Sequence, residues 1–163
     1  DRYSQAVKTA NWQYYEPRTA HDSSLSPMAY ALVAADVGMT EWAYTYFMHT
    51  AMLDLLGTGP HWNLGVHTAA MGGAWLAIVH GFCHLDLHED GVHLSGWPVL
   101  PAGWRRIGFR FFWHGQRVRF SADSRATLLE ALDGPVPVLH PGGSSVLHPG
   151  QPLRLIHNTR SAQ

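Results

Sequence analysis

The stretch "RRIGFRFFWHGQRVRFSA", residues 105–122, decides the fold of the carboxy-terminal half of this chain. Its side chains alternate in the manner of a β-strand, and one face carries large apolar residues: Ile107, Phe109, Phe111 and Trp113. The other face carries Arg110, Phe112 and His114. His114-Gly115 is typical of a two-residue hairpin turn, because glycine readily takes a positive φ. Val118 and Phe120 continue the apolar face on the returning strand.

Downstream of this hairpin the pattern of short strands continues. We expect strands at "ATLLEAL", "VPVLH", "SSVLH" and "PLRLIH", separated by the turn sequences "DGP", "PGG" and "PGQ". Short strands at this spacing favour a small antiparallel β-sandwich. We assign residues 84–163 to it and interpret "EDGVHLSGWPVLPAGW" as a bridge between two halves of the chain.

Upstream, residues 1–83 have helical patterns. Ser26 is a candidate N-cap with Pro27 at the first helical position, and Gly38 predicts the end of that helix. Thr40 is the candidate cap of a second helix, "EWAYTYFMHTAMLDLL", which should end at the turn-rich "GTGP" of residues 57–60. The fold class is therefore α+β.

A third predicted helix, "HTAAMGGAWLAIVHGF" at residues 67–82, is apolar nearly all round. Such a helix is buried on most sides, and three helices cannot hide this much apolar surface among themselves. We therefore expect the helices to pack against further helices that the chain lacks. The absence of a methionine at position 1 likewise suggests a piece of a longer protein.

Composition excludes several classes of function. Of the 163 residues, 46% are hydrophobic and 14% charged, and the formal net charge is −1. With no block of like charge, we expect neither a nucleic acid nor an anionic membrane as partner. No apolar run approaches the ~20 residues of a membrane span. The single cysteine, Cys83, excludes an internal disulfide and fits a reducing, cytoplasmic compartment.

The motif "HDSSLSP", residues 21–27, has three interpretations. A Ser-His-Asp triad is disfavoured, because neighbours in sequence cannot converge in line and there is no G-x-S-x-G elbow. Alternatively, Ser23 and Ser24 add hydroxyl donors to a helix N-terminus, where unpaired N–H groups attract an anion such as phosphate. The third interpretation is simple helix capping by Ser26.

Two other stretches leave alternatives open. In "GVHTAAMGGAW", Gly72 and Gly73 permit the close approach of a ligand or of another helix, and His67 could donate to an anion. In "HGFCHLDLHEDGVH", His80, His84 and His88 have helical spacing for a metal. We expect no metal there, because the helix should end near Gly81 and no H-E-x-x-H is present.

The motifs resemble glycoside hydrolase family 65, the maltose, trehalose and kojibiose phosphorylases and their hydrolytic relatives. The resemblance covers nearly the whole chain, in four stretches: "YYEPRTAHDSSLSP" (14–27), "GVHTAAMGGAWLAIVHGF" (65–82), "LPAGWRRIGFRFFWHGQRVRF" (100–120) and "HPGQPLRL" (148–155). It implies that residues 1–83 are the last helices of an (α/α)6 catalytic barrel and that residues 84–163 are the carboxy-terminal β domain. The family's Lys-Gln sugar-binding motif and its catalytic acid would lie upstream.

The resemblance also implies an inverting cleavage of an α-glucoside, in which inorganic phosphate, as co-substrate without any further cofactor, yields β-glucose 1-phosphate and a sugar. The implied phosphate-binding residues are Ser23, Ser24, His67, Gly72 and Gly73. The implied partners are a disaccharide, the upstream segments of the enzyme and a second copy in a dimer. This chain alone should be inactive, because it lacks the acid.

Departures from the family pattern keep alternatives open. The segment "GTGPHWNLG" before His67 differs from the Asn-Thr-x-x-Gly type stretch of the family, which leaves the sugar specificity open. His21, Asp22 and Glu16 are possible substrate-site residues; Glu16 or Asp22 could be the base of a hydrolase, or could hold local structure with Arg18 as partner. A non-catalytic carbohydrate-binding module is the other alternative, with aromatic residues that could stack on sugars: Trp97, Trp104 and Phe112.

Overall fold

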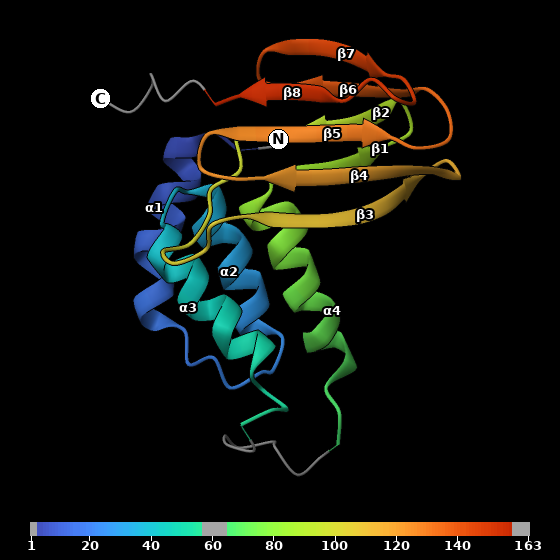
Figure 1. Cartoon of the computed structure of the whole chain (residues 1–163). Helices are drawn as coiled ribbons and strands as arrows, with labels where there is room; N and C mark the ends of the chain where they lie inside the picture. Colours follow the sequence, from blue (N-terminus) through green and yellow to red (C-terminus); the bar gives the residue numbers. More distant parts are fainter. Residues whose placement is uncertain (1–2, 57–64, 158–163) are drawn as a thin grey trace. The chain divides into compact units, whose positions relative to one another are not determined.

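The structure is a computed structural model that describes residues 3–56 and 65–157 (Figure 1). The chain divides into two compact units, Asp1–Phe82 and Cys83–Gln163. The first consists of helices and the second of strands. Predicted helical and strand-rich halves are thus both found, and each unit is described by itself.

The first unit begins with a helix that sequence patterning does not predict, α1 (Gln5–Tyr15). Ser4 caps it, because its Oγ accepts a hydrogen bond from the backbone N–H of Val7 at 3.4 Å. Trp12 is its buried residue, and the indole packs edge-on against Tyr46 with ring centroids 6.2 Å apart. A single buried aromatic in a polar segment gives no helical apolar period, which explains why the helix was missed. A short 3₁₀ turn, η1 (Glu16–Arg18), follows.

The next two helices lie close to their predicted positions. Helix α2 (Ser26–Asp36) contains Ser26 as its first residue, whereas the N-cap is Leu25. The prediction that Ser26 is the cap is therefore wrong: its hydroxyl bonds His21 Nδ1 at 2.7 Å instead. Gly38 follows the end of α2 with φ +78°, as predicted for a helix stop.

Helix α3 (Thr40–Ala51) has Met39 as its N-cap, and Thr40 provides no side-chain cap. It ends five residues before the predicted Leu56, because residues 52–55 form turns. The predicted turn at residues 57–60 lies outside the described residues.

Helix α4 (Thr68–Leu76) continues as a π-helical turn, η2 (Ala77–Phe82). The prediction of a helix from His67 to Phe82 is therefore correct in extent, with His67 as the N-cap. Within this chain, however, α4 is not buried on most sides, since it exposes one apolar face: Met71, Trp75 and Leu76.

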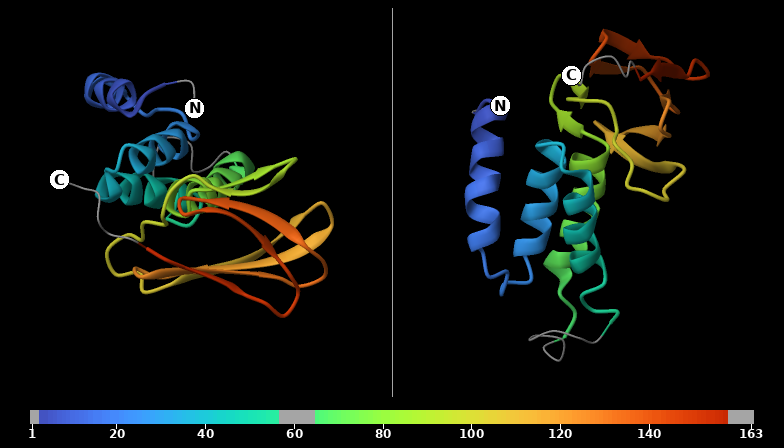
Figure 2. Two further views of the ribbon diagram at one scale, coloured as in Figure 1. Left: turned by 90° about the horizontal axis from the view of Figure 1, so that it is seen from above. Right: turned by 90° about the vertical axis from the view of Figure 1, so that its left-hand side faces the viewer.

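Helices α2 and α4–η2 run side by side in the same direction. A Cβ at Gly73 would overlap Met28 in the first turn of α2, and a Cβ at Gly81 would contact Ala35 in the last turn. Both α2 and α4 therefore begin at the same end of the helical unit, as Figure 2 (right) also shows. This parallel arrangement positions the candidate site described below.

The second unit is a β-sandwich of two four-stranded sheets. The first sheet has the order β1-β2-β6-β7, with these bounds: β1 Leu85–His88, β2 Gly91–Leu94, β6 Val136–His140 and β7 Gly143–Leu147. The second has the order β3-β4-β5-β8: β3 Ile107–Trp113, β4 Gln116–Ala122, β5 Ala126–Ala131 and β8 Leu153–Ile156. The inner faces contribute buried residues that include Val92, Val138, Val118, Phe120 and Leu129.

The predicted β3–β4 hairpin is confirmed in register. Trp113 pairs with Gln116 across the turn, and both His114 and Gly115 have positive φ, +45° and +78°. This is the signature of a type I′ turn, which matches the right-handed twist of the strands.

Two features of the sandwich differ from the prediction. The supposed bridge contains strand β2, which forms a hairpin with the preceding strand β1, Leu94 opposite Leu85. In addition, β2 pairs with β6 in parallel, Val92 opposite Val138, so the sandwich is mixed rather than purely antiparallel. A four-residue strand offers too few alternations to be recognised, and pairing across 46 positions depends on tertiary packing.

Candidate functional site

The loop that precedes α2 carries the two candidate serines. Ser23 is exposed, its carbonyl accepts from Ser26 N at 3.1 Å and its Oγ accepts from Leu25 N at 3.3 Å. Ser24 is half-buried, and its hydroxyl makes no hydrogen bond with any residue in the described parts of the chain. The hydroxyl that is free to take a ligand is therefore that of Ser24, beside the N–H groups of the first turn of α2.

His21 fixes the conformation of this loop. Its backbone has φ +55°, which is costly for a residue with a Cβ and persists only where contacts impose it. Those contacts are to the ring: Nδ1 lies 2.7 Å from Ser26 Oγ, and Nε2 lies 3.1 Å from Tyr46 Oη. The ring also packs against Tyr30, with centroids 4.5 Å apart. His21 is thus a structural residue of the loop.

Glu16 closes the same network. Tyr46 Oη donates to Glu16 Oε1 at 2.7 Å, and burial together with this hydrogen bond raises the pKa of Tyr46. The phenol therefore stays protonated as a donor. Of the two interpretations for Glu16, the geometry favours the holding of local structure over the base of a hydrolase. Arg18 pairs with neither candidate carboxylate: it donates to the Tyr14 carbonyl at 2.7 Å and lies over the Tyr14 ring.

Asp22 has a different setting from Glu16. It is exposed and makes no hydrogen bond or ion pair with the described residues. The structural role considered for Asp22, a pairing with Arg18, is therefore not found among the described residues.

His67, the second predicted anion donor, is held by a carboxylate that sequence reasoning missed. Asp54 Oδ1 lies 2.6 Å from His67 Nδ1, and Asp54 Oδ2 accepts from the His67 backbone N–H at 2.8 Å. Both side chains are mostly buried, 14% exposed for His67 and 17% for Asp54. The hydrogen bonds from His67 lower the pKa of Asp54. With Nδ1 occupied by a carboxylate, Nε2 is the nitrogen left to face a ligand.

The two glycines of α4 differ in role. Gly73 is buried against Met28, whose Cγ would overlap an added Cβ. Gly72 is exposed, with nothing within 4 Å of an added Cβ. Both lie inside α4, where their N–H groups bond within the helix, so the free backbone donors belong to the first turn at Ala69 and Ala70. The role of Gly72 and Gly73 in phosphate binding stays a prediction.

These elements lie at the same end of the unit, because α2 and α4 both begin there. One terminus is preceded by Ser23 and Ser24, and the other by His67. Each N-terminus carries partial positive charge and unpaired N–H groups. The arrangement can hold an anion with hydroxyl, imidazole and backbone donors.

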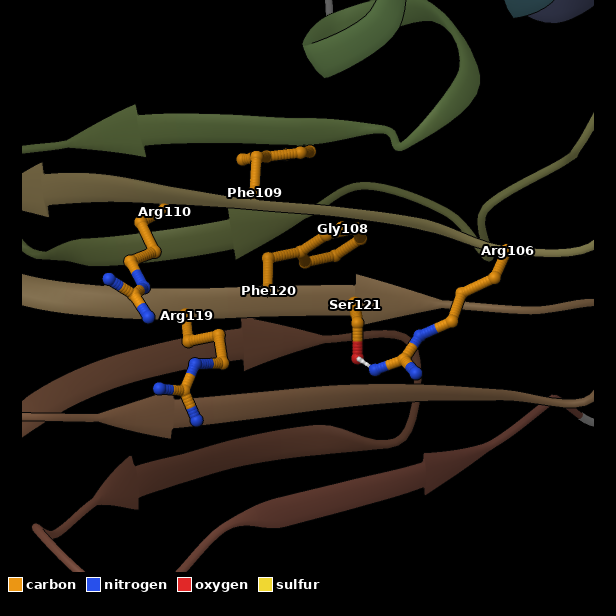
Figure 3. A pocket seen from close by; sticks show the side chains of 7 residues that line it. All are labelled: Arg106, Gly108, Phe109, Arg110, Arg119, Phe120 and Ser121. Carbon is orange, nitrogen blue, oxygen red and sulfur yellow. Dashed lines mark hydrogen bonds between the residues drawn. The ribbon is translucent and has the colours of Figure 1, made fainter.

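The β unit holds two other polar clusters. One is a groove of about 400 Å³ on the β3–β4 hairpin, lined with arginines (Figure 3). The other groups His88, Asp90 and His93, whose ligand atoms lie within 4.8 Å of one another and which could hold a divalent cation. His80, His84 and His88 do not lie on one helix, because η2 ends at Phe82 and His88 lies on β1.

The aromatic residues proposed for sugar stacking are not equally available. Phe112 is 66% exposed on β3. Trp97 is half-buried and stacks on His157, with centroids 5.3 Å apart, and Trp104 is also half-buried. The three do not form one exposed platform.

Two family models match the chain. The "Glycosyl hydrolase family 65 central catalytic domain" matches residues 1–76, and the "Glycosyl hydrolase family 65, C-terminal domain" matches residues 85–155. The helical unit and the sandwich thus correspond to two adjoining domains of one family. The chain belongs to glycosyl hydrolase family 65, as the sequence motifs predict.

The curated relatives are named phosphorylases. Over 134 residues the chain is 39% identical to an alpha,alpha-trehalose phosphorylase from Geobacillus stearothermophilus, a match that covers 82% of the chain and 17% of the relative. It is 43% identical over 119 residues to a 1,2-alpha-glucosylglycerol phosphorylase from Bacillus selenitireducens, covering 70% and 15%. The chain therefore spans about a sixth of the length of these relatives.

A solved structure shares the fold. A putative kojibiose phosphorylase from the human microbiome superposes with a TM-score of 0.82 at 26% identity, over 99% of this chain and 23% of that one. The predicted order of helices followed by a β domain is thereby confirmed. No helix in the described ranges is long and apolar enough to cross a membrane.

Proposed function

We propose that this chain is the carboxy-terminal part of an inverting disaccharide phosphorylase. The intact enzyme would cleave an α-glucoside of the trehalose, maltose or kojibiose type with inorganic phosphate, releasing a sugar and β-glucose 1-phosphate. Phosphate would replace the water of an inverting hydrolase and attack the anomeric carbon from the face opposite the leaving group. The single observation that carries this proposal is the pair of parallel helix N-termini flanked by Ser24 and by the Asp54-held His67.

The chemistry of these donors suits phosphate. A phosphate dianion accepts several hydrogen bonds, and charge-assisted bonds each contribute on the order of 1.5–3 kcal/mol. Ser24 has an unengaged hydroxyl, and the Asp54 carboxylate holds His67 Nδ1, so that Nε2 is the ring nitrogen left for the anion. The two helix N-termini add partial positive charge that is fixed in place by the backbone. A water nucleophile would need a carboxylate base instead; Glu16 is engaged by Tyr46, which leaves Asp22 as the candidate base for a hydrolase.

The remaining machinery would lie in other segments of the enzyme. We place the general acid, and the residues that bind the non-reducing glucose, upstream of this chain. The exposed apolar face of α4 supports this division, since Met71, Trp75 and Leu76 are suited to contact further barrel helices. We assign residues 1–83 to the barrel and 84–163 to the β domain, with a cytoplasmic dimer as the working state of the enzyme.

The test compares phosphorolysis with hydrolysis. The intact enzyme is incubated with trehalose, maltose and kojibiose, each with and without inorganic phosphate, and the products are resolved by chromatography and by the anomeric proton signals. We expect β-glucose 1-phosphate only in the presence of phosphate. Free glucose formed at the same rate with and without phosphate would establish the hydrolase of the same family.

The active-site assignment has its own control. Ser24→Ala should raise KM for phosphate about 10-fold, the value for the loss of one charge-assisted hydrogen bond. Ser4→Ala removes a hydroxyl of the same size from the cap of α1, outside the site, and should leave this KM unchanged. Equal effects of the two substitutions would contradict the assignment.

A further inference from the structure

A second polar hollow lies on the β unit, remote in sequence from the helix-terminus site. We refer to it as the arginine groove: a depression of about 400 Å³ on the outer face of the β3–β4 hairpin, lined by Arg106, Gly108, Arg110, Arg119 and Ser121 together with parts of Phe109 and Phe120. Figure 3 shows the guanidinium groups of Arg110 and Arg119 pointing to the same side of the sheet. All its residues belong to the β unit, so its geometry depends on that unit alone.

The backbone register brings two of these charges together. Arg110 on β3 is directly opposite Arg119 on β4, in a ladder that runs without interruption from Ile107–Ala122 to Trp113–Gln116. Side chains directly opposite in an antiparallel pair have Cβ atoms only about 5 Å apart, and like charges in this position are destabilising. Gly108 and Ser121, the next pair on this face, add no bulk, which leaves the hollow open.

The internal partners neutralise the groove only in part. Arg119 forms an ion pair with Glu130 on β5 at 2.7 Å, and Arg106 donates to Ser121 Oγ at 3.2 Å. Arg110 makes no hydrogen bond or ion pair with any described residue. Three arginines against one carboxylate leave two positive charges in excess.

The neighbouring Arg117 shows what a satisfied arginine on this hairpin looks like. Its side chain and backbone N–H both bond Asp133, with Nε at 2.9 Å and N at 2.8 Å. The pairing raises the pKa of Arg117 and lowers that of Asp133 to about 2. Arg110 has no such carboxylate among the described residues, so its positive charge is not compensated by an ion pair as that of Arg117 is.

We propose that the arginine groove binds a phosphate-type dianion, either free phosphate or the phosphoryl group of a sugar phosphate. The excess of two positive charges matches a phosphoryl group, which carries close to two negative charges at neutral pH. Planar guanidinium forks bind phosphate oxygens in pairs, and two forks from opposite strands can grip one tetrahedral group. Ser121, only 7% exposed, retains its hydroxyl proton as a further donor.

This site is separate from the phosphate site proposed at α2 and α4, and it does not depend on the proposed reaction. It would remain a ligand site on the β domain even in an enzyme that hydrolyses its substrate. Bound phosphate would relieve the repulsion between Arg110 and Arg119, so we expect it to stabilise the hairpin.

The experiment counts phosphate sites on the intact protein. Isothermal titration with inorganic phosphate, at constant ionic strength with chloride as the balancing anion, should give two sites per chain. Arg110→Gln should lose one of them, with binding weakened at least about 10-fold for the loss of a charge-assisted fork. The KM for phosphate in catalysis should not change. Ser24→Ala should weaken the other site and leave the groove intact.

The location is checked directly. Crystals soaked in tungstate, a heavy tetrahedral oxyanion, should show an anomalous peak between the guanidinium groups of Arg110 and Arg119, and this peak should vanish in Arg110→Gln. Titration with glucose 1-phosphate identifies the source of the phosphoryl group: tighter binding than phosphate indicates a sugar phosphate, and equal binding indicates free phosphate.

The matched control is Arg125→Gln, which removes one exposed arginine from a turn of the same unit outside the groove. It should retain both sites. An equal loss in Arg125→Gln and Arg110→Gln would reduce the effect to net surface charge and overturn the proposal. A single site abolished by Ser24→Ala, with no tungstate peak at Arg110, would overturn it as well, while leaving the phosphorylase assignment standing.

Discussion

Asp54 is the residue on which the orientation of His67 depends. Its two oxygens bond the ring nitrogen and the backbone N–H of the same histidine, which fixes both the ring and the start of α4. The sequence gives little sign of it: Asp54 is a lone carboxylate in "AMLDLLG", 13 residues before His67, and no fixed spacing links the two. The serines and His67 themselves could be singled out, because they stand next to predicted helix starts.

The first prediction concerns this pair. In the intact enzyme, Asp54→Asn should raise KM for phosphate by about 10- to 100-fold, the range for losing a charge-assisted hydrogen bond, with a smaller effect on kcat. Because the His67 hydrogen bonds lower the pKa of Asp54 below 3.8, the bond is at full strength above that pH and is lost as pH falls through the lowered value. Phosphate binding in the wild type should therefore persist to a lower pH than the ordinary carboxyl pKa suggests.

Asp36→Asn is the control for that substitution. Asp36 pairs with Lys8 on the surface of the helical unit at 2.7 Å and does not contact His67. Its replacement should change KM for phosphate less than 2-fold, as expected of an exposed ion pair worth about 0–1 kcal/mol. A KM that rises equally in both variants would show that Asp54 has no specific role in positioning.

The second prediction separates the two glycines of α4. Gly73→Ala should lower the free energy of unfolding by about 1–3 kcal/mol, because its Cβ would overlap Met28. Gly72→Ala has open space and should be neutral or stabilising by up to about 1 kcal/mol from helix propensity. Chemical denaturation measures both. Met28→Ala in the Gly73→Ala background should recover part of the loss, and additive effects would contradict the packing described.

At the scale of the elements, the loop between η1 and α2 is held by a chain of hydrogen bonds from Glu16 through Tyr46 and His21 to Ser26. It joins α3 to the loop, so that the phenol of one helix sets the conformation in front of another. The positive φ of His21 is the strain that this network holds in place.

The third prediction tests that network. Tyr46→Phe should reduce the free energy of unfolding by about 1–3 kcal/mol, the cost of leaving the half-buried Glu16 acceptor unpaired, and should speed amide hydrogen exchange in residues 19–25. KM for phosphate should rise as the loop loses its fixed conformation. Tyr15→Phe removes an exposed phenol from α1 and should alter none of these quantities. Unchanged exchange in Tyr46→Phe would rule out control of the loop by Tyr46.

The elements that could be predicted are those whose apolar residues recur with a clear strand or helix period over several residues. The β3–β4 hairpin was predictable because seven alternating residues on β3 and a His-Gly turn agree with one another. Helix α2 was predictable from Pro27 and Gly38. The β1–β2 hairpin was not, since Leu85–His88 and Gly91–Leu94 are four residues each and are stabilised by contacts far along the chain. Trp113, for example, donates to the His88 carbonyl at 2.8 Å.

At the scale of the whole molecule, the helical unit exposes large apolar side chains on several helices: Val33, Trp42, Met71, Trp75 and Leu76. The sequence predicted this excess, because its third helix is apolar nearly all round. Sequence patterning does not predict what covers this surface, because an apolar face indicates that a surface is buried but not by which residues. Sugar specificity was not predictable either, because the segment that departs from the family pattern, residues 57–65, lies outside the described residues except for Gly65.

The fourth prediction follows from that exposed surface. Expressed alone, residues 1–163 should aggregate or require the rest of the enzyme for solubility, because large contiguous apolar patches drive association. Size-exclusion chromatography with light scattering measures this, and co-expression with the upstream segments should restore a defined species. A monodisperse monomer that melts cooperatively would contradict the assignment of these helices to a larger barrel.

Cys83 lies where the helical unit ends and the β unit begins, fully buried, with burial raising the pKa of its thiol to about 12. Since only the thiolate reacts with alkylating reagents, the folded protein should resist them at neutral pH. Any labelling in native buffer must then pass through an opened conformation, so its rate reports how often the structure around Cys83 opens. Because Cys83 is the only cysteine of the chain, its alkylation rate measures local unfolding at residue 83, and mass spectrometry can follow that rate without an introduced probe.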